Sequence, residues 1–125
     1  MSLTPEARMR EVFDDLARDD MDALLSNWAD DGVYFNPTVG PPARGKSSVR
    51  DTITTMSSGL QARGETLIVD RVDTIGEGHS TRLYAQWHAE GGAKPGRLGL
   101  HVVSFNEAGL LQRVTVFAHN ESFEV

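Results

Sequence analysis

Two histidines and one asparagine are the side chains of this sequence whose positions best suit chemistry. His101 lies in the β-rich run RLGLHVVSF, His88 lies in the run TRLYAQWHAE, and Asn36 follows the run VYF just before Pro37. An imidazole titrates near neutral pH, so small pKa shifts keep it useful as a proton donor or acceptor. An amide cannot act as a base, but it can donate a hydrogen bond to a carbonyl or enolate oxygen. These residues are therefore candidates for acid–base chemistry assisted by an oxyanion donor.

The alternation of side chains along each strand predicts which groups share a site with His101. Residues two apart on a strand face the same way, so His101 and Val103 are expected on one face. The family resemblance described below implies that this face lines a cavity. On the preceding strand, Tyr84, Gln86 and His88 share a face, and the hairpin register implied by the same resemblance would point that face into the same cavity.

The predicted cavity is mostly apolar with a few convergent polar groups, which is typical of a small-molecule site. Its expected apolar walls are Phe13, Trp28, Tyr34, Val103 and Val116. Its expected polar groups are Asn36, Tyr84, Gln86, His88 and His101, of which His101, Asn36 and Tyr84 are the catalytic candidates. Trp87 falls on the opposite strand face from Tyr84, so it is expected outside, where a second subunit could cover it.

Each candidate also has a purely structural interpretation, which the sequence leaves open. His101 could be hydrogen-bonded within the sheet, Asn36 could simply start a turn with Pro37, and Tyr84 could be a core residue whose hydroxyl reaches water. Without a nearby carboxylate, His88 and His101 fall short of a usual catalytic zinc set, so neither a metal nor a cofactor is expected.

The carboxylates offer no obvious catalytic pair. Seven aspartates crowd the N-terminal quarter of the chain, in positions typical of helix caps and solvated faces. Asp70 and Asp73 are an odd number of residues apart, which predicts opposite faces of one strand.

Three helices are expected in the N-terminal half of the chain. Thr4-Pro5 is a cap and first-turn pair, and apolar residues follow at helical spacing. A second short helix is expected to carry an apolar stripe that includes Trp28, with Asp19 or Asp20 as its cap. The run ADDG would end it, VYF would form a short strand, and Ser47 would open the third helix after the loop PTVGPPARG.

After residue 64 the apolar pattern changes to period two. The runs TLIVDRVDTIG, TRLYAQWHAE, RLGLHVVSF and LLQRVTVFAHN are separated by turn signals, which predicts an antiparallel meander. Helices first and strands afterwards favour an α+β fold. We expect a single domain over residues 1–125, in which a curved, mostly antiparallel sheet wraps against three N-terminal helices as a cone.

Three segments carry a resemblance to a known family: LARDDMDALLSNWADDGVYFNP, ARGKSSVRDTI and VVSFNEAGLLQRVTVF. In this order they resemble the SnoaL-like group of the nuclear transport factor two superfamily, which includes ketosteroid isomerases and small polyketide cyclases. The resemblance implies a conical, cystatin-like α+β fold, usually dimeric, with no obligatory metal or cofactor. It does not imply one reaction, because function resides in the site rather than in the fold.

The ketosteroid isomerase residues are not found at the matching positions. That enzyme uses an Asp base with an oxyanion hole of Tyr and protonated Asp. By resemblance the base position falls on Asn36, the protonated acid on His101, and the tyrosine on Val12, next to Phe13. All three depart from the isomerase pattern, so steroid isomerisation by that mechanism is not expected.

Composition narrows the possible partners. The net charge of -6 argues against nucleic acid or an anionic membrane. No apolar run approaches the roughly 20 residues that cross a bilayer. The lack of cysteine excludes disulfides and thiol chemistry, and a cytoplasmic location is the default expectation.

Three functions remain open from the sequence. The first is a cofactor-free isomerase, cyclase or dehydratase acting on a hydrophobic carbonyl compound, as a homodimer. The second is a non-catalytic binder of a small apolar ligand, and the third is an interaction module that uses the outer sheet face. A polar group within about 3 Å of His101 would favour the enzyme. A closed, apolar cavity would favour the binder, and a filled one the interaction module.

Overall fold

The computed structural model describes residues 4–37, 39–92 and 97–118. Within these ranges the helices are α1 (Pro5–Ala17), α2 (Met21–Leu25) and α3 (Lys46–Arg63). The strands are β1 (Trp28–Phe35), β2 (Ala43–Arg44), β3 (Glu65–Ile75), β4 (Arg82–Gly91), β5 (Leu98–Phe105) and β6 (Leu111–Ala118). A short 3-10 helix, η1 (Gly78–Ser80), lies between β3 and β4.

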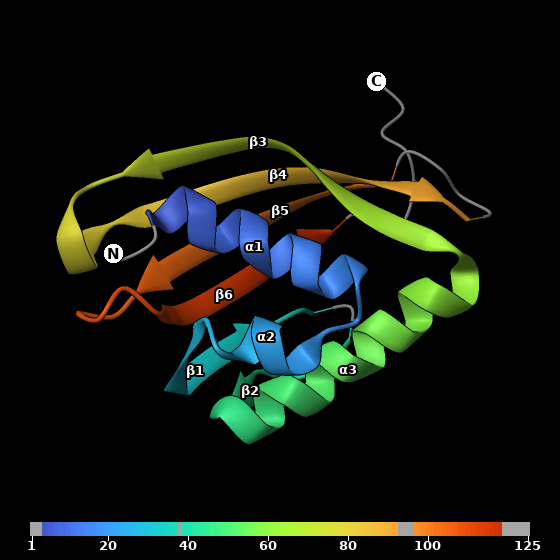
Figure 1. The fold of residues 1–125 in the computed structure, drawn as a ribbon, viewed down its shortest axis with the longest axis horizontal. Coiled ribbons are helices and arrows are strands. Elements are labelled where there is room, and N and C mark those ends of the chain that lie inside the picture. Colours follow the sequence, from blue (N-terminus) through green and yellow to red (C-terminus); the bar gives the residue numbers. More distant parts are fainter. Residues whose placement is uncertain (1–3, 38, 93–96, 119–125) are drawn as a thin grey trace.

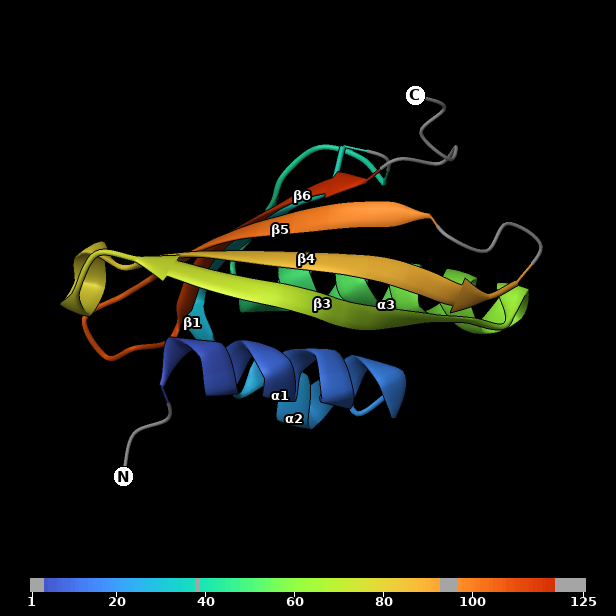
Figure 2. The same ribbon diagram turned by 90° about the horizontal axis from the view of Figure 1, so that it is seen from above.

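The strands form one six-stranded sheet in the order β2-β1-β6-β5-β4-β3. All neighbours are antiparallel except β1 and β6, which are parallel. In Figure 1, α1 crosses the sheet, and α3 runs from the β2 edge towards the start of β3. Figure 2 shows α1 and α2 together on one side of β3, β4 and β5. The expected α+β class, with three helices against a mostly antiparallel sheet, is confirmed.

Local signals place the first two helices. The hydroxyl of Thr4 accepts a hydrogen bond from the Ala7 amide at 3.1 Å, and Pro5 occupies the first turn. Asp20 caps α2 by accepting from the Ala23 amide at 3.1 Å. These contacts confirm the predicted start of α1 and one of the two predicted caps of α2.

The predicted end of the second helix is wrong. Trp28 is the first residue of β1, and the run ADDG continues that strand. The reason is tertiary: Trp28 pairs with Leu111 of β6, and the Leu111 amide donates to the Asn27 carbonyl at 2.8 Å. The register then shifts between Trp28 and Val33, so the strand absorbs extra residues as an irregularity.

The inner faces of β5 and β6 agree with the predicted alternation. His101, Val103 and Phe105 are all buried, and so are Val114 and Val116 of β6. These residues form the concave, helix-facing side of the sheet.

Strand β4 faces the opposite way from the prediction. Residues directly opposite in an antiparallel pair point to the same side of the sheet, and Ala85, not Tyr84, lies opposite His101. The expectation that Tyr84, Gln86 and His88 point into the cavity is therefore wrong. They lie on the outer face, where Gln86 is exposed and the other two are half-buried.

The residues between them fill the inner face instead. Leu83, Ala85, Trp87 and Ala89 are between 0% and 3% exposed. The expectation that Trp87 lies outside is wrong for the same reason. Apolar residues at every second position are the ordinary signature of a core-facing strand face.

A bulge alters β3 as well. Val69 and Arg71 pair with consecutive residues of β4, which leaves Asp70 as an extra residue. The Asp70 carboxylate lies 2.8 Å from His88, and Asp73 pairs with Tyr84. Both aspartates thus lie on the outer side of the sheet, and the predicted separation onto opposite faces is wrong.

Candidate functional site

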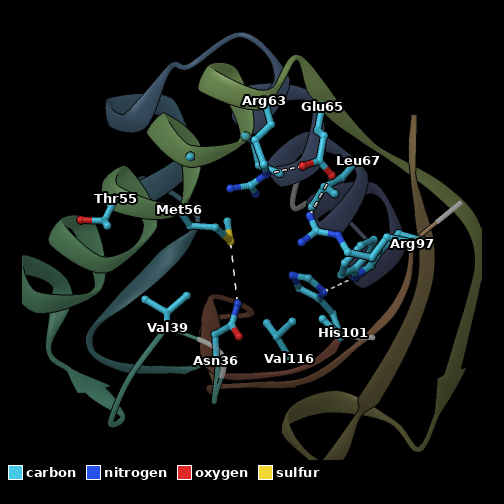
Figure 3. A pocket seen from close by; sticks show the side chains of 14 residues that line it. Asn36, Val39, Thr55, Met56, Arg63, Glu65, Leu67, Arg97, His101 and Val116 are labelled. Carbon is cyan, nitrogen blue, oxygen red and sulfur yellow. Dashed lines mark hydrogen bonds and ion pairs between the residues drawn. The ribbon is translucent and has the colours of Figure 1, made fainter. Parts of the chain in front are cut away.

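A cavity of about 710 Å³ opens between α3 and the concave face of the sheet (Figure 3). Its helix side is lined by Thr55, Met56, Gly59, Leu60 and Arg63. Its sheet side is lined by Glu65, Leu67, Trp87, His101, Val116 and Ala118, and Asn36, Val39 and Arg97 complete it. The cavity is neither closed and wholly apolar nor filled, so its shape suits a small molecule.

His101 lies in the middle of β5, with its ring against the cavity. Trp87 Nε1 donates a hydrogen bond to His101 Nδ1 at 2.8 Å. An indole nitrogen can only donate, so Nδ1 must be unprotonated and the proton of the neutral ring is on Nε2. In Figure 3 the other ring nitrogen of His101 points into the open space of the cavity. The group presented to a ligand is therefore an N–H donor.

Burial keeps that imidazole uncharged. Desolvation lowers the pKa of His101 from its ordinary value to about 3. The ring centroid lies 4.9 Å from that of Phe13 and 6.0 Å from that of Trp87. To act as a base at Nε2, the ring would have to move its proton to Nδ1, where it would face the Trp87 N–H. The geometry favours a neutral hydrogen-bond donor over a group that titrates near neutral pH.

Gly99 makes room for this arrangement. It pairs directly with Trp87 across β4 and β5. A Cβ atom on residue 99 would lie 1.9 Å from Trp87 Cζ2, so the indole lies across the bare glycine backbone. Gly99 is thus a positioning residue for Trp87 and, through it, for His101.

Asn36 provides a second polar group on the cavity wall. It is 6% exposed, and its Nδ2 lies 3.4 Å from Tyr34 Oη, to which it donates. Tyr34 Oη donates in turn to Met56 Sδ at 3.2 Å. Burial raises the pKa of Tyr34 to about 12, so the phenol stays protonated. Asn36 and His101 together make a neutral, hydrogen-bonding wall.

Three charged side chains at the cavity were missed by the sequence reasoning. Arg97 Nη2 lies 3.2 Å from Glu65 Oε2, and Arg63 Nε pairs with Glu65 Oε1. The Glu65 side chain is only 6% exposed. The period-two pattern could have found Glu65, because it falls in phase with the inward-facing Leu67. No sequence pattern indicated that the two arginines converge on it.

The other predicted wall residues divide between the cavity and the core. Val116 lines the main cavity. Phe13, Trp28 and Tyr34 line a separate void of about 20 Å³ between the helices and the sheet. Val103 is fully buried in the core. The predicted pocket was therefore too deep, because it merged the core with the open cavity.

His88 forms a different cluster on the outer face. Its ring nitrogens lie 2.8 Å from Asp70 and 3.0 Å from Glu90. Hydrogen bonds that His88 donates to the carboxylates of Glu90 and Asp70 raise its pKa. Among the residues that the structure describes, no group of three or more potential ligands suits a metal ion. In the same part of the chain, no helix is both long and apolar enough to cross a membrane.

Solved structures with the same architecture are numerous. A putative ketosteroid isomerase from Kribbella flavida DSM 17836 is 20% identical with a TM-score of 0.73, over 97% of this chain and 81% of that one. SalBIII, an epoxide hydrolase/cyclase-like enzyme in pyran ring formation in the polyether salinomycin, is 14% identical with a TM-score of 0.75, over 93% and 91%.

A protein of unknown function with a cystatin-like fold from Methylobium petroleophilum PM1 is 16% identical with a TM-score of 0.73, over 96% of this chain and 78% of that one. At these identities the likeness establishes the fold alone. No curated protein matches the sequence. The profile of the SnoaL-like domain matches residues 9–111.

Proposed function

This chain belongs to the SnoaL-like domain family, and from that premise and the geometry of its cavity we propose that it binds a small, largely apolar carbonyl compound and stabilises negative charge on the carbonyl oxygen. The observation that carries the proposal is the hydrogen bond from Trp87 to His101 Nδ1. It leaves Nε2–H as a fixed donor in a cavity that also has apolar walls.

A fixed neutral donor suits a reaction in which an oxygen gains charge. Donors of the oxyanion-hole type are worth roughly 3–4 kcal/mol to the transition state, because they need no reorganisation when the charge develops. His101 would donate to the substrate oxygen, and the Asn36 amide would contact the same oxygen or a neighbouring one. Isomerisation, cyclisation or dehydration of a carbonyl compound that proceeds through an enolate develops such charge on its oxygen.

The same site also supports a non-catalytic binder. Within the described residues, Glu65 is the one carboxylate that lines the cavity, and each of its oxygens pairs with an arginine. A general base free to remove a substrate proton is therefore not evident among these side chains. Binding of an apolar carbonyl ligand without turnover is the second candidate function.

Substituted phenols provide the test, because a bound phenolate mimics an enolate oxygen. We expect the protein to bind phenolates in its cavity, and His101→Phe to weaken that binding at least tenfold. Tyr84→Phe is the matched control, since Tyr84 lies on the outer sheet face. Equal phenolate affinities for the native protein and His101→Phe, measured by absorbance titration, would remove His101 from the proposal.

We also propose a homodimer formed through the outer sheet face. This face carries the exposed Phe117, the half-buried Tyr84, and Leu100 and Val102 between them. Apolar and aromatic side chains of this kind are enriched at the centres of protein interfaces. The cytoplasmic location expected from the sequence stays a prediction.

A further inference from the structure

We propose that Arg63 and Arg97 form an anion-binding subsite in the cavity, which selects ligands with a carboxylate in addition to the oxygen that His101 contacts. The inference rests on the proposed function for the location of the ligand, but it concerns different atoms. It narrows the ligand class from apolar carbonyl compounds to apolar compounds with an acidic end.

Both guanidinium groups belong to the same cavity as His101. Arg63 is the last residue of α3, and Arg97 directly precedes β5. Figure 3 shows the two side chains extending towards the open space, with Glu65 beside them. The cavity therefore carries both cationic side chains and a neutral hydrogen-bond donor on its wall.

The charge balance of this region is positive. Two guanidiniums against the single carboxylate of Glu65 leave one positive charge in excess among the described lining residues. The chain as a whole carries -6. In an acidic protein, a concave site with the opposite sign favours anions locally and raises their association rate.

The arginines also keep donors available for a ligand. A guanidinium has five N–H donors in a planar fork, which matches the two oxygens of a carboxylate. Arg97 uses Nη2 on Glu65 and its side chain stays 18% exposed, and Arg63 uses Nε and its side chain stays 51% exposed. Glu65 holds both side chains in place, so less conformational freedom is lost when an anion binds.

The test compares octanoate with 1-octanol, which share an alkyl chain and differ in charge. By isothermal titration calorimetry, we expect native protein to bind octanoate about tenfold more tightly. Arg97→Gln is expected to reduce this preference to less than about twofold, and Arg63→Gln to reduce it in the same direction. Arg63 is half exposed at a helix end, so its variant is expected to fold.

Arg71→Gln is the matched control. It removes the same charge from an exposed ion pair with Asp73 on β3, away from the cavity. We expect the octanoate preference to be unchanged in this variant. The proposal is overturned if native protein shows no preference, if Arg71→Gln lowers the preference as much as Arg97→Gln does, or if both cavity variants keep it.

Failure of the anion-subsite proposal is distinguishable from failure of the proposed function. The phenol test varies His101, whereas the alkanoate test varies Arg63 and Arg97 with ligands that lack a ketone. If phenolates bind equally to native protein and His101→Phe while the octanoate preference is intact, only the oxyanion donor is refuted. If the octanoate preference is absent while His101→Phe weakens phenolate binding, only the anion subsite is refuted. Circular dichroism melting curves confirm that each variant is folded before its affinity is interpreted.

Discussion

Trp87 and His101 meet on the cavity wall, and the contact between their side chains decides which ring nitrogen carries the proton. The sequence predicted His101 correctly as a buried, inward-facing residue of its strand. It suggested an imidazole that titrates near neutrality. The structure surrounds the ring with Phe13 and Trp87 and lowers its pKa to about 3, which favours a donor that stays neutral.

Replacement of Trp87 by Phe tests this assignment at the residue scale. The variant removes the donor to His101 Nδ1 and keeps an aromatic ring in place. We expect the protein to lose about 1–3 kcal/mol of stability, because a buried acceptor is left without a partner. Long-range ¹H–¹⁵N NMR spectra should show the native His101 with its proton on Nε2, and a mixture of tautomers in the variant. A native proton on Nδ1 would contradict the assignment.

The pKa of His101 also predicts how stability depends on pH. The folded-state pKa is lowered to about 3 from an ordinary value of 6.5. Below about pH 6.5 the unfolded chain therefore binds a proton that the folded protein does not, and stability falls as pH decreases towards 3. From this residue alone, the slope approaches about 1.4 kcal/mol per pH unit. Urea unfolding should show that slope in native protein and not in His101→Gln.

His88 should change the pH dependence of stability in the opposite direction from His101. Glu90 and Asp70 raise its folded-state pKa, so its contribution to stability is present below pH 6.5 and is lost as pH rises through the raised value. His88→Gln serves as the control for the preceding experiment, because it should remove this contribution and leave the slope from His101. If both variants give the same pH profile, the assignment of these two environments is incorrect.

The pairing of β4 with β5 is the element-scale feature on which the site depends. It sets Trp87 against Gly99 and Ala85 against His101. A shift of one residue in this register would exchange the two faces of β4 and bring Tyr84 inward. The register is what places an indole donor, rather than a phenol, beside the imidazole.

Gly99→Ala tests this feature. The added Cβ would overlap the Trp87 indole, so the ring must move away from His101. We expect a loss of about 1–3 kcal/mol from overpacking, measured by urea unfolding, and a decrease in phenolate binding. Gly109→Ala is unsuitable as a control, since residue 109 has a φ of 80° that is strained for alanine. Gly32→Ala is equally unsuitable, because its Cβ would lie 2.9 Å from Trp28.

An alanine substitution on the outer face of β5 is a better control for Gly99→Ala. Val102→Ala alters β5 between Leu100 and Ser104 without touching the inward-facing row. It should leave phenolate binding at the native level. Unchanged phenolate binding in Gly99→Ala would show that the indole position does not matter to the ligand.

At the scale of the whole molecule, the helices of the described residues pack against the concave side of the sheet, and none of them covers the other side of β4 and β5 (Figure 2). Phe117 is 53% exposed on that side. If a second copy covers it, Phe117→Asp should place a charge in an apolar interface and convert a dimer into a monomer. Light scattering at micromolar concentration checks both proteins. A native monomer would contradict the proposed dimer.

The sequence by itself determined the architecture. Helical spacing, the caps at Thr4 and Asp20 and the period-two runs are local signals, because each depends on neighbours within a few residues. They predicted the three helices, the four long strands after residue 64 and the α+β class. Alternation also predicted which residues of β5 and β6 share a face, and the family resemblance implied that these faces point inward.

Only the tertiary structure decided what the site contains. The apolar residues at every second position of β4 do indicate that Tyr84, Gln86 and His88 point outward. The register of β4 against β5 carries no such local signal, because it joins residues that are far apart in sequence. The indole beside His101 follows from that register. The ion pairs of Arg63 and Arg97 with Glu65 depend on how α3, β3 and the start of β5 meet in space. Contacts of this kind are set by packing and loop closure between distant segments, for which no short stretch of sequence carries a signal.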